Sequence, residues 1–469
     1  MSEAKTYQCP NCGGQVRFVI GEQALVCRHC GHEFEPGEWD VALPVAKEQE
    51  SSKDTQNRLN AGSVGEFLLH APWDTVDENT PGVKEYSCPS CGARVFADQS
   101  VMSTRCPYCS NTMLVSGIAT KETVPDLILP FLIDKESARE ILAEHFANKF
   151  YLPTGFTVSV EHMQPLYVPY WLLNVYTEGE LGWIMSRNVN KTTYYKYSFR
   201  GGAGSHRLVP VDASARMPDA YMDAISPFDL KNLEGFTTQY VAGFMMEAPD
   251  VSKEACGWRA QSMAERSLRH NLEESICEEA GLKRDTIKSD SWFSGVQVRG
   301  KLADKIDSRV ATSVLCVLPV WILHATWKGE DLLFAINGRT GECVGDLPVS
   351  SVKRSVFIYV IGPLLCVLVL AMAASASCTS SGNYVRSASS ATNSATGTVA
   401  FLIILLLSII YIISSIDRYY VSQLKTAVRS KDSREAQASG GVRITKNVSS
   451  GWCTSEAEAR KKYREALNK

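Results

Sequence analysis

Eight cysteines near the start of the chain form four Cys-x-x-Cys pairs, arranged as two matching sets. The first set is Cys9, Cys12, Cys27 and Cys30, and the second set is Cys88, Cys91, Cys106 and Cys109. In each set fourteen residues separate the two pairs, and a tyrosine lies two positions before the first cysteine. Four thiolates at this spacing supply the tetrahedral sulfur ligands that zinc prefers. The cysteines therefore predict two zinc ribbons, each with one zinc ion.

Two hairpins stapled by disulfides are the alternative interpretation of the same cysteines. Disulfides persist in oxidising compartments, whereas the remainder of this chain is typical of an intracellular protein. Residues 1–20 hold cysteines and polar side chains where a signal peptide would need an apolar stretch. We therefore expect reduced thiols that bind zinc.

The charge of the chain is distributed unevenly. Residues 1–120 carry nine basic and fifteen acidic residues, a balance of −6, whereas residues 417–469 carry twelve basic and six acidic residues, a balance of +6. Two zinc ions on eight thiolates would bring the first region to about −10, because each loaded ribbon adds −2. Nucleic-acid binding depends on lysine and arginine neutralising phosphates. The charge of the ribbon region therefore disfavours nucleic acid as a partner.

Two apolar runs occur late in the sequence, at Val356 to Ala374 and at Thr398 to Ile416. Each run is about 28 Å long as a helix, which is close to the hydrocarbon thickness of a bilayer. Basic residues flank the pair on both sides. The positive-inside rule then places both ends of the hairpin in the cytoplasm. The sequence thus predicts a multi-pass protein of the cell (inner) membrane with both termini cytoplasmic.

Composition and pattern divide the chain into segments. The expected units are a zinc ribbon at 1–37, an acidic connector with a short helix at 38–85, a second ribbon at 86–115, an α+β cytosolic domain at 125–350, a transmembrane hairpin at 355–417 and a basic cytosolic tail at 418–469 that ends in a helix. The predicted fold class is therefore multidomain, with two small β ribbons, an α+β domain built on an antiparallel sheet, and two transmembrane helices.

The 125–350 segment shows both helical and strand patterns. Asp134 is a suitable N-cap for a helix through Lys149, and a long helix is expected from Ser252 to Ala280, where Gly281 ends it. Strands are expected at 130–133, 166–177, 193–200, 313–327, 332–336 and 342–346, with turns at 188–191 and at Asn337-Gly338. In the tail, Ser455 and Glu458 form a capping box.

Sequence motifs for catalysis are largely missing. The glycine-rich stretch 200–205 lacks the strand and helix context of a nucleotide-binding loop and the lysine–serine pair of a P-loop, so we expect an ordinary loop. A cluster of acidic residues and one histidine matches no metal-site spacing, and we expect Asp212, Ser214 and Asp229 to act as caps and turn formers. Its members are His206, Asp212, Asp219, Asp223 and Asp229. The sequence therefore does not predict an enzyme. Cys256, Cys277, Cys316 and Cys343 belong to no Cys-x-x-Cys pair, and we expect them to be buried reduced thiols.

Several stretches resemble a known family. The ribbons resemble the transcription factor IIB-type zinc ribbon, and the whole arrangement resembles a bacterial family of membrane proteins that carry such ribbons and are often labelled primosomal helicase-like. The stretches that carry this resemblance are 129–131, 164–171, 239–244, 318–321 and 337–341. Some members are similar to the membrane adaptor encoded beside a phage-shock protein A homologue. The resemblance implies recruitment of envelope-stress proteins, and the missing P-loop argues against helicase activity.

These features together predict a membrane-anchored, cytosol-facing zinc-ribbon adaptor. Its ribbons and its 125–350 domain would bind protein partners, and its spans and basic tail would bind membrane lipid. One alternative is a membrane-tethered zinc-ribbon protein that binds nucleic acid. A second alternative is an enzyme whose site lies in the 125–350 domain.

Overall fold

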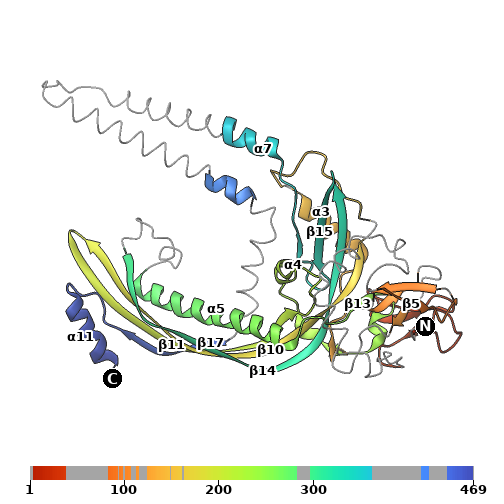
Figure 1. The fold of residues 1–469 in the computed structure, drawn as a ribbon, viewed down its shortest axis with the longest axis horizontal. Helices are drawn as coiled ribbons and strands as arrows, with labels where there is room; N and C mark the ends of the chain where they lie inside the picture. Colours follow the sequence, from red (N-terminus) through yellow and green to blue (C-terminus); the bar gives the residue numbers. More distant parts are fainter. Residues whose placement is uncertain are drawn as a thin grey trace.

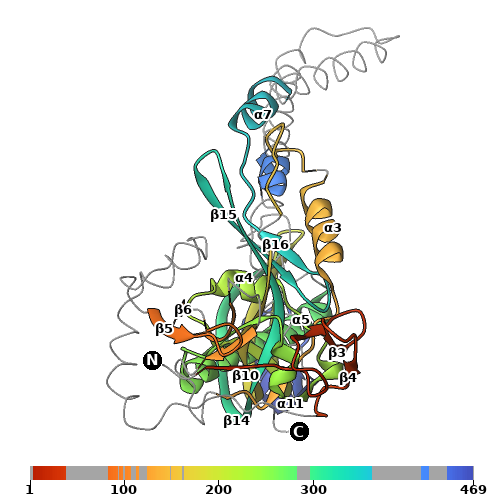
Figure 2. The same ribbon diagram turned by 90° about the vertical axis from the view of Figure 1, so that its right-hand side faces the viewer.

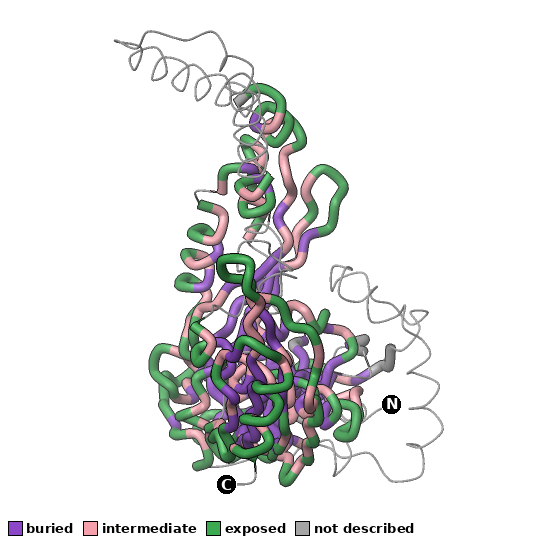
Figure 3. Tube along the Cα trace, turned by 90° about the vertical axis from the view of Figure 1, so that its left-hand side faces the viewer, coloured by how far each residue is buried: buried purple, intermediate pink, exposed green. Residues whose placement is uncertain are grey.

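The computed structural model of the chain is dominated by one long, curved β-sheet (Figure 1). It describes residues 4–38, 83–92, 94–98, 101–106, 112–115, 124–147, 149–160, 163–281, 296–361, 414–421 and 441–467. The N-terminal strands lie at one end of the curve and the C-terminal helix at the other (Figure 1). Buried residues follow the sheet, and exposed residues lie around it (Figure 3).

Twelve strands make up the main sheet, and most of the pairs are antiparallel. The path runs β1-β8-β7-β13-β10-β14-β15-β16, while β11, β17, β9 and β12 join from the sides. Its strands are β1 Ala4–Thr6, β7 Val101–Arg105, β8 Thr112–Val115, β9 Leu127–Ile128, β10 Gln164–Val189, β11 Thr192–Asp212, β12 Glu234–Gly235, β13 Met245–Glu247, β14 Val296–Trp327, β15 Glu330–Asn337, β16 Cys343–Gly345 and β17 Gly441–Ser449. Two pairs are parallel, β10 with β13 and β14 with β9, so the sheet is mixed.

Three strands are much longer than an ordinary strand and form the curve. β10 has 26 residues, β11 has 21 and β14 has 32. The turn between β10 and β11 uses Asn190 and Lys191, both with positive φ, as the predicted turn at 188–191 requires. Register shifts interrupt the pairing of β10 with β14 at three places. Such irregularities bend a strand, which accounts for the curvature of the sheet.

The helix α5, Lys253–Ala280, lies along the inner side of the curved strands (Figure 1). Ser252 caps its start by accepting a hydrogen bond from the Ala255 amide, and Gly281 ends it in the left-handed conformation at φ +70°. Its buried side chains include Met263, Leu268 and Leu272. The predicted helix at 252–280 and its predicted end at Gly281 are confirmed.

Two further helices confirm local sequence signals. α3, Lys135–Phe146, is capped by Asp134, whose Oδ1 accepts from the Ser137 amide at 2.8 Å. α11, Glu456–Leu467, is capped by Ser455, whose hydroxyl accepts from the Glu458 amide at 3.2 Å. Capping signals are local, so they survive whatever tertiary arrangement surrounds them.

The small strands of the ribbons form two further sheets. In the first ribbon β2, Val16–Val19, β3, Ala24–Cys27, and β4, Glu33–Phe34, are antiparallel neighbours. In the second ribbon β5, Val83–Ser87, pairs with β6, Arg94–Asp98. The other ribbon strands, β1, β7 and β8, belong to the main sheet, and the two ribbons flank its end (Figure 2).

The predicted fold class is wrong in its balance of elements. An α+β domain with an antiparallel sheet was expected, whereas the structure is mainly β, with a mixed sheet and few helices. The sequence patterns predict only one part of each long strand: 166–177 of β10, 193–200 of β11 and 313–327 of β14. β14 starts at Val296, whereas the predicted strand starts at Ser313. The first half of β14 has no apolar pattern, because it carries charged residues on an exposed surface. Strand pairing with β10 determines its length.

Two local predictions also fail. Residues 130–133 are not a strand. The strand in this part of the chain is β9, which ends at Ile128. The glycine-rich stretch 200–205, expected as a loop, lies inside β11. A Cβ on Gly202 would come within 2.9 Å of Leu272 and 3.2 Å of Leu268. The glycines therefore allow α5 to pack closely on the strand.

The predicted transmembrane hairpin is overturned. Within the described part of the chain, none of the helices combines the length and the apolar character needed to cross a bilayer. Both predicted spans, at 356–374 and 398–416, lie mostly outside the described residues. The predicted multi-pass location in the inner membrane depends on this hairpin, so it is corrected together with it.

The two described stretches on either side of 362–413 are joined by a buried carboxylate. The first comprises α7, Ser351–Val356, and η4, Phe357–Ile361, and the second is the helical stretch 414–421. Arg354 donates to Asp417 from Nε at 3.0 Å and from Nη2 at 2.9 Å. The Tyr151 hydroxyl donates to the same carboxylate at 3.1 Å. The side-chain hydrogen bonds from Arg354 hold the pKa of Asp417 below its usual range.

Candidate metal centres

The four cysteines of the first ribbon meet beside the β2-β3-β4 sheet. The Sγ atom of Cys9 lies 3.7 Å from that of Cys30, and the Sγ atom of Cys12 lies 3.5 Å from that of Cys27. All four sulfurs lie within 4.8 Å of one another. Cys9 and Cys27 are buried, while Cys12 and Cys30 are exposed. This set could hold one metal ion.

Each Cys-x-x-Cys pair of the first ribbon is closed by a glycine. The Gly13 amide donates to the Cys9 carbonyl at 2.8 Å, and the Gly31 amide donates to the Cys27 carbonyl at 3.0 Å. Both glycines adopt positive φ, +71° and +69°. Glycine takes this left-handed conformation without a Cβ clash, so both tight turns are preorganised to point two sulfurs at one place.

The surroundings of the sulfurs fit a metal ion. A Cβ on Gly14 would lie 2.7 Å from the Cβ of His29 and within 3.3 Å of two cysteine sulfurs, so only glycine lets the backbone pass there. Backbone amides point at Cys27: that of Cys30 and then that of His29 lower the pKa of the Cys27 thiol to about 6. The thiolate is the form that binds a metal.

The second ribbon repeats this arrangement. Cys88, Cys91 and Cys106 gather with their sulfurs within 4.8 Å of one another, and Cys91 Sγ lies 3.8 Å from Cys106 Sγ. The Gly92 amide donates to the Cys88 carbonyl at 2.8 Å, with φ +74° at the glycine. Cys109, the fourth predicted ligand, lies outside the described residues.

The chain therefore contains two cysteine clusters that could each hold a metal ion. The seven described ribbon cysteines form no disulfides, unlike in the disulfide-stapled alternative. Cys256, Cys277, Cys316 and Cys343 are buried reduced cysteines as expected, and burial raises the pKa of Cys256 and of Cys343 to about 12. Such thiols are protonated and unreactive at neutral pH.

The first ribbon packs against the body of the protein. The Phe18 amide donates to the Ala242 carbonyl at 2.9 Å, and its ring lies 5.4 Å from Tyr240 and 6.2 Å from Phe244. From the β2–β3 turn, Gln23 Nε2 donates to the Phe131 carbonyl at 2.8 Å. The 310 turn η3, Thr238–Val241, supplies part of this surface.

The second ribbon contacts the next residues of the same segment. β7 pairs with β13, with Ser103 opposite Met246 and Val101 opposite Glu247. The Ser103 hydroxyl donates to the Phe244 carbonyl at 3.0 Å. Phe244 therefore lies between the two ribbons and contacts both of them.

Residues from the five stretches that carry the family resemblance meet beneath the ribbons. Phe131 is the centre: its ring lies 5.1 Å from Tyr167, 5.1 Å from Phe244 and 5.5 Å from Trp321. The Gly338 amide donates to the Pro319 carbonyl at 2.9 Å. We call this set of aromatic rings, Phe131, Tyr167, Phe244 and Trp321, the aromatic junction. It connects the metal centres with the main sheet.

The predicted acidic cluster is brought together only in part, around an arginine of α5. Arg259 contacts Asp212 at 2.9 Å, Asp219 at 3.0 Å and Asp223 at 3.5 Å. Burial raises the pKa of Asp212 to about 7. Asp212 and Asp223 are almost fully buried, and Asp219 and Asp223 belong to α4, Asp219–Ala224. The group forms an ion-pair cluster that holds α5 to the sheet.

The other members of that cluster lie elsewhere. His206 Nε2 lies 3.2 Å from the Thr177 hydroxyl inside the sheet. Asp229 caps the short turn η2, Leu230–Asn232, by accepting from the Lys231 amide, as the sequence predicts for a cap. Asp212, by contrast, is an ion-pair partner rather than a cap.

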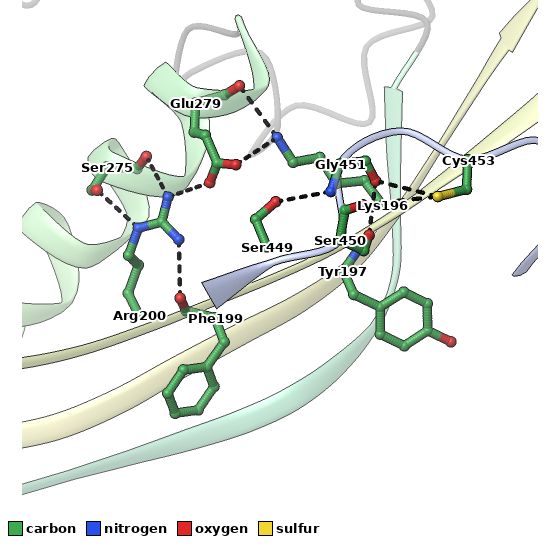
Figure 4. A network of polar contacts seen from close by, with 10 residues as sticks. All are labelled: Lys196, Tyr197, Phe199, Arg200, Ser275, Glu279, Ser449, Ser450, Gly451 and Cys453. Carbon is green, nitrogen blue, oxygen red and sulfur yellow. Dashed lines mark hydrogen bonds and ion pairs between the residues drawn. The ribbon is translucent and has the colours of Figure 1, made fainter. Parts of the chain in front are cut away.

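A second polar network lies at the C-terminal end of α5 and was missed by the sequence analysis. Figure 4 shows Lys196 and Arg200 of β11 pointing at Glu279. Lys196 contacts Glu279 Oε1 at 3.1 Å, and Arg200 contacts Oε2 and the Ser275 hydroxyl. Both cations are buried, and the side-chain hydrogen bonds keep the pKa of Glu279 below its usual value despite partial burial. Buried cations here also complement the helix C-terminus.

Weak signals for both networks exist in the sequence. Arg259 lies three positions after Cys256 on the apolar face of the predicted helix, and Lys196 and Arg200 lie in the predicted alternating strand. An arginine or lysine at an inward position needs a carboxylate partner. The partners are 47 and 83 residues away, at Asp212 and Glu279, so spacing alone does not identify them.

Comparison with curated proteins finds a relative of similar extent. The chain is 23% identical over 364 residues to the "Uncharacterized protein YdjG" of Bacillus subtilis (strain 168), a match that covers 74% of this chain and 91% of the relative. No family model matches the chain. No solved structure matches it either.

Proposed function

We propose that the chain is a zinc-binding adaptor that docks protein partners through its ribbon end. The observation that carries the proposal is the pair of cysteine clusters, held rigidly against the aromatic junction with part of each cluster exposed. Ribbons of this size offer a fixed surface because a metal replaces a large core. The family resemblance supports a role in the recruitment of envelope-stress proteins.

Zinc is the metal that best suits these sites. Tetrahedral sets of four sulfur ligands select zinc or iron, and zinc is the usual ion in paired Cys-x-x-Cys ribbons. Elemental analysis of the full-length protein, purified under reducing conditions, should find two zinc ions per chain. Iron in place of zinc would contradict this assignment.

Exposed charge on the first ribbon favours a basic protein partner. Glu33, Glu35 and Glu38 are exposed around β4. Arg17 and Arg28 are the exposed basic residues of this ribbon among the described positions. Complementary charge accelerates association and selects partners more than it adds affinity. A nucleic acid would instead meet like charge here.

The test is capture of partners by the full-length protein and by matched variants. Glu33→Lys should reduce capture, whereas Glu22→Lys, the same charge change in the β2–β3 turn, should not. Cys9→Ser with Cys12→Ser should abolish it. Capture that is indifferent to all of these changes would contradict the adaptor. Recovery of nucleic acid that declines steeply with salt would favour the nucleic-acid alternative.

A further inference from the structure

The first ribbon contributes a strand, β1, that pairs with a strand of the second ribbon within the main sheet. β1 precedes the first cysteine cluster, yet it pairs with β8, which follows the second cluster. The register is antiparallel, with Ala4 opposite Val115 and Thr6 opposite Met113. In the second ribbon the equivalent strand, β5, pairs with β6 of its own ribbon. The two ribbons therefore share a ladder.

Strand β8 has buried side chains on both of its sides, and they belong to two different core clusters. Met113 and Val115 belong to a buried cluster with Tyr86, Cys88 and Cys106, which surrounds the second set of cysteines. Leu114, between them, belongs to the main core, which also contains Tyr7, Cys9 and Cys27 of the first ribbon. A change in the position of β8 would therefore reach the surroundings of both clusters.

A side-chain hydrogen bond also connects β1 directly to the second cluster. The hydroxyl of Ser90, which lies between Cys88 and Cys91, donates to Thr6 Oγ1 at 3.4 Å. Thr6 is three residues before Cys9, the first sulfur ligand of the other ribbon. Only the Tyr7-Gln8 dipeptide separates this contact from the first cluster.

We propose that the two metal centres are thermodynamically coupled through β1, so that an ion bound in either ribbon raises the metal affinity of the other. The coupling rests on metal binding by both clusters, as the zinc assignment does, but not on the adaptor role. Metal binding orders a ribbon, and an ordered first ribbon holds β1 against β8. Linkage then requires the effect to be equal in both directions.

The coupling gives the ribbon end two principal states. With both ions bound, Phe18 and Ser103 hold the segment around Phe244 from two sides. When one ion is lost, the shared ladder weakens and the second ion leaves more readily. The surface of the ribbon end is then assembled or released as a unit, and half-loaded protein is a minor species.

Cobalt(II) titration of the full-length, reduced protein measures the coupling, because cobalt–thiolate absorption reports each occupied cluster. Cys9→Ser with Cys12→Ser leaves the second cluster, and Cys88→Ser with Cys91→Ser leaves the first. These variants give the two single-site binding constants. The constant for binding two ions to the wild-type protein should exceed their product by about tenfold, in the usual range of allosteric coupling.

A variant that retains all eight ribbon cysteines separates coupling from misfolding. Thr6→Pro removes a strand amide and the hydroxyl that accepts from Ser90. It should still bind two cobalt ions with four-thiolate spectra, but its two-ion constant should fall to the product of the single-site constants. Gly21→Ala, in open space in the β2–β3 turn, is the matched control and should behave as the wild type.

Each outcome of these titrations either supports or overturns the coupling. A wild-type constant within twofold of the product of the single-site constants would overturn it. Retention of the tenfold excess in Thr6→Pro would also overturn it, because β1 would not carry the effect. A tenfold excess that disappears in Thr6→Pro and persists in Gly21→Ala supports it, whether or not a protein partner is ever captured.

Discussion

The two ends of the curved sheet are stabilised by different chemistry. At the ribbon end, small sheets surround two cysteine clusters, and each ribbon buries a small set of side chains around its sulfurs. At the other end, α5, β17 and α11 cover the strands, and buried cations pair with carboxylates. We expect the first end to depend on a bound metal, whereas the second depends on burial and ion pairs. The metal can be removed without changing the ion pairs, and the ion pairs can be removed without changing the metal ligands.

Metal removal should give the largest difference between the two ends. A chelator under reducing conditions should abolish hydrogen-exchange protection in residues 4–38 and 83–106, because metal binding contributes on the order of 10 kcal/mol to ribbons of this type. Protection of α5 should be unchanged. Equal loss of protection in α5 would show that the two ends unfold as one unit.

Phe18→Ala should detach the first ribbon from the body. The Phe18 ring is buried against Tyr240 and Phe244. Truncation of a buried phenylalanine costs about 3 kcal/mol of unfolding free energy. Denaturant unfolding should show this loss, and hydrogen exchange at 237–244 should increase. Arg17→Ala, an exposed neighbour on β2, should leave both measurements near those of the wild type.

Glu279→Gln should weaken the other end alone. The change leaves Lys196 and Arg200 buried without a carboxylate. Breaking a buried ion pair costs 3–5 kcal/mol, but solvent screens this one-third-exposed carboxylate, so about 2 kcal/mol is expected. Thermal unfolding followed at α5 is the measurement. Glu278→Gln, the adjacent exposed residue, is the control, and an equal effect of both changes would exclude a specific role for Glu279.

Asp212→Asn should have the smallest effect at neutral pH, about 1 kcal/mol, because the amide oxygen can still accept from Arg259. Its signature is the pH dependence. The native pKa of about 7 lies above the ordinary value of 3.8, so the folded state holds an extra proton between these limits. Wild-type stability from this group is therefore fully present at low pH and is lost as the pH rises to about 7.

The variant should flatten that slope, and the comparison of the two proteins removes contributions from other carboxylates. Denaturant midpoints of α5 unfolding from pH 5 to pH 8 are the measurement. Parallel curves for Asp212→Asn and the wild type would mean that Asp212 does not carry the proton.

The ribbon end was far easier to predict from sequence than the rest. Cysteine spacing, knuckle glycines and helix caps are signals within a few residues, and Cys9, Cys27, Ser252 and Gly281 behave as their neighbours predict. The long strands could not be predicted in full, because their length comes from pairing with distant partners. β17 joins β11 across more than 200 residues, and its sequence resembles an ordinary basic tail.

The acidic cluster shows the same limit at the level of a site. The sequence identifies the aspartates as a cluster. Their role as ion-pair partners depends on Arg259, which lies on a separate helix. The loop predicted for the glycine-rich stretch 200–205 is wrong for the same reason. Gly202 indicates a loop when only its neighbours are considered, and it indicates close packing once Leu272 is placed over it.

The Arg354–Asp417 contact has a practical consequence for protein engineering. This ion pair and the Tyr151 hydroxyl hold together the two described stretches that flank 362–413. A short glycine–serine linker could therefore replace 362–413 without separating α7 from residues 414–421.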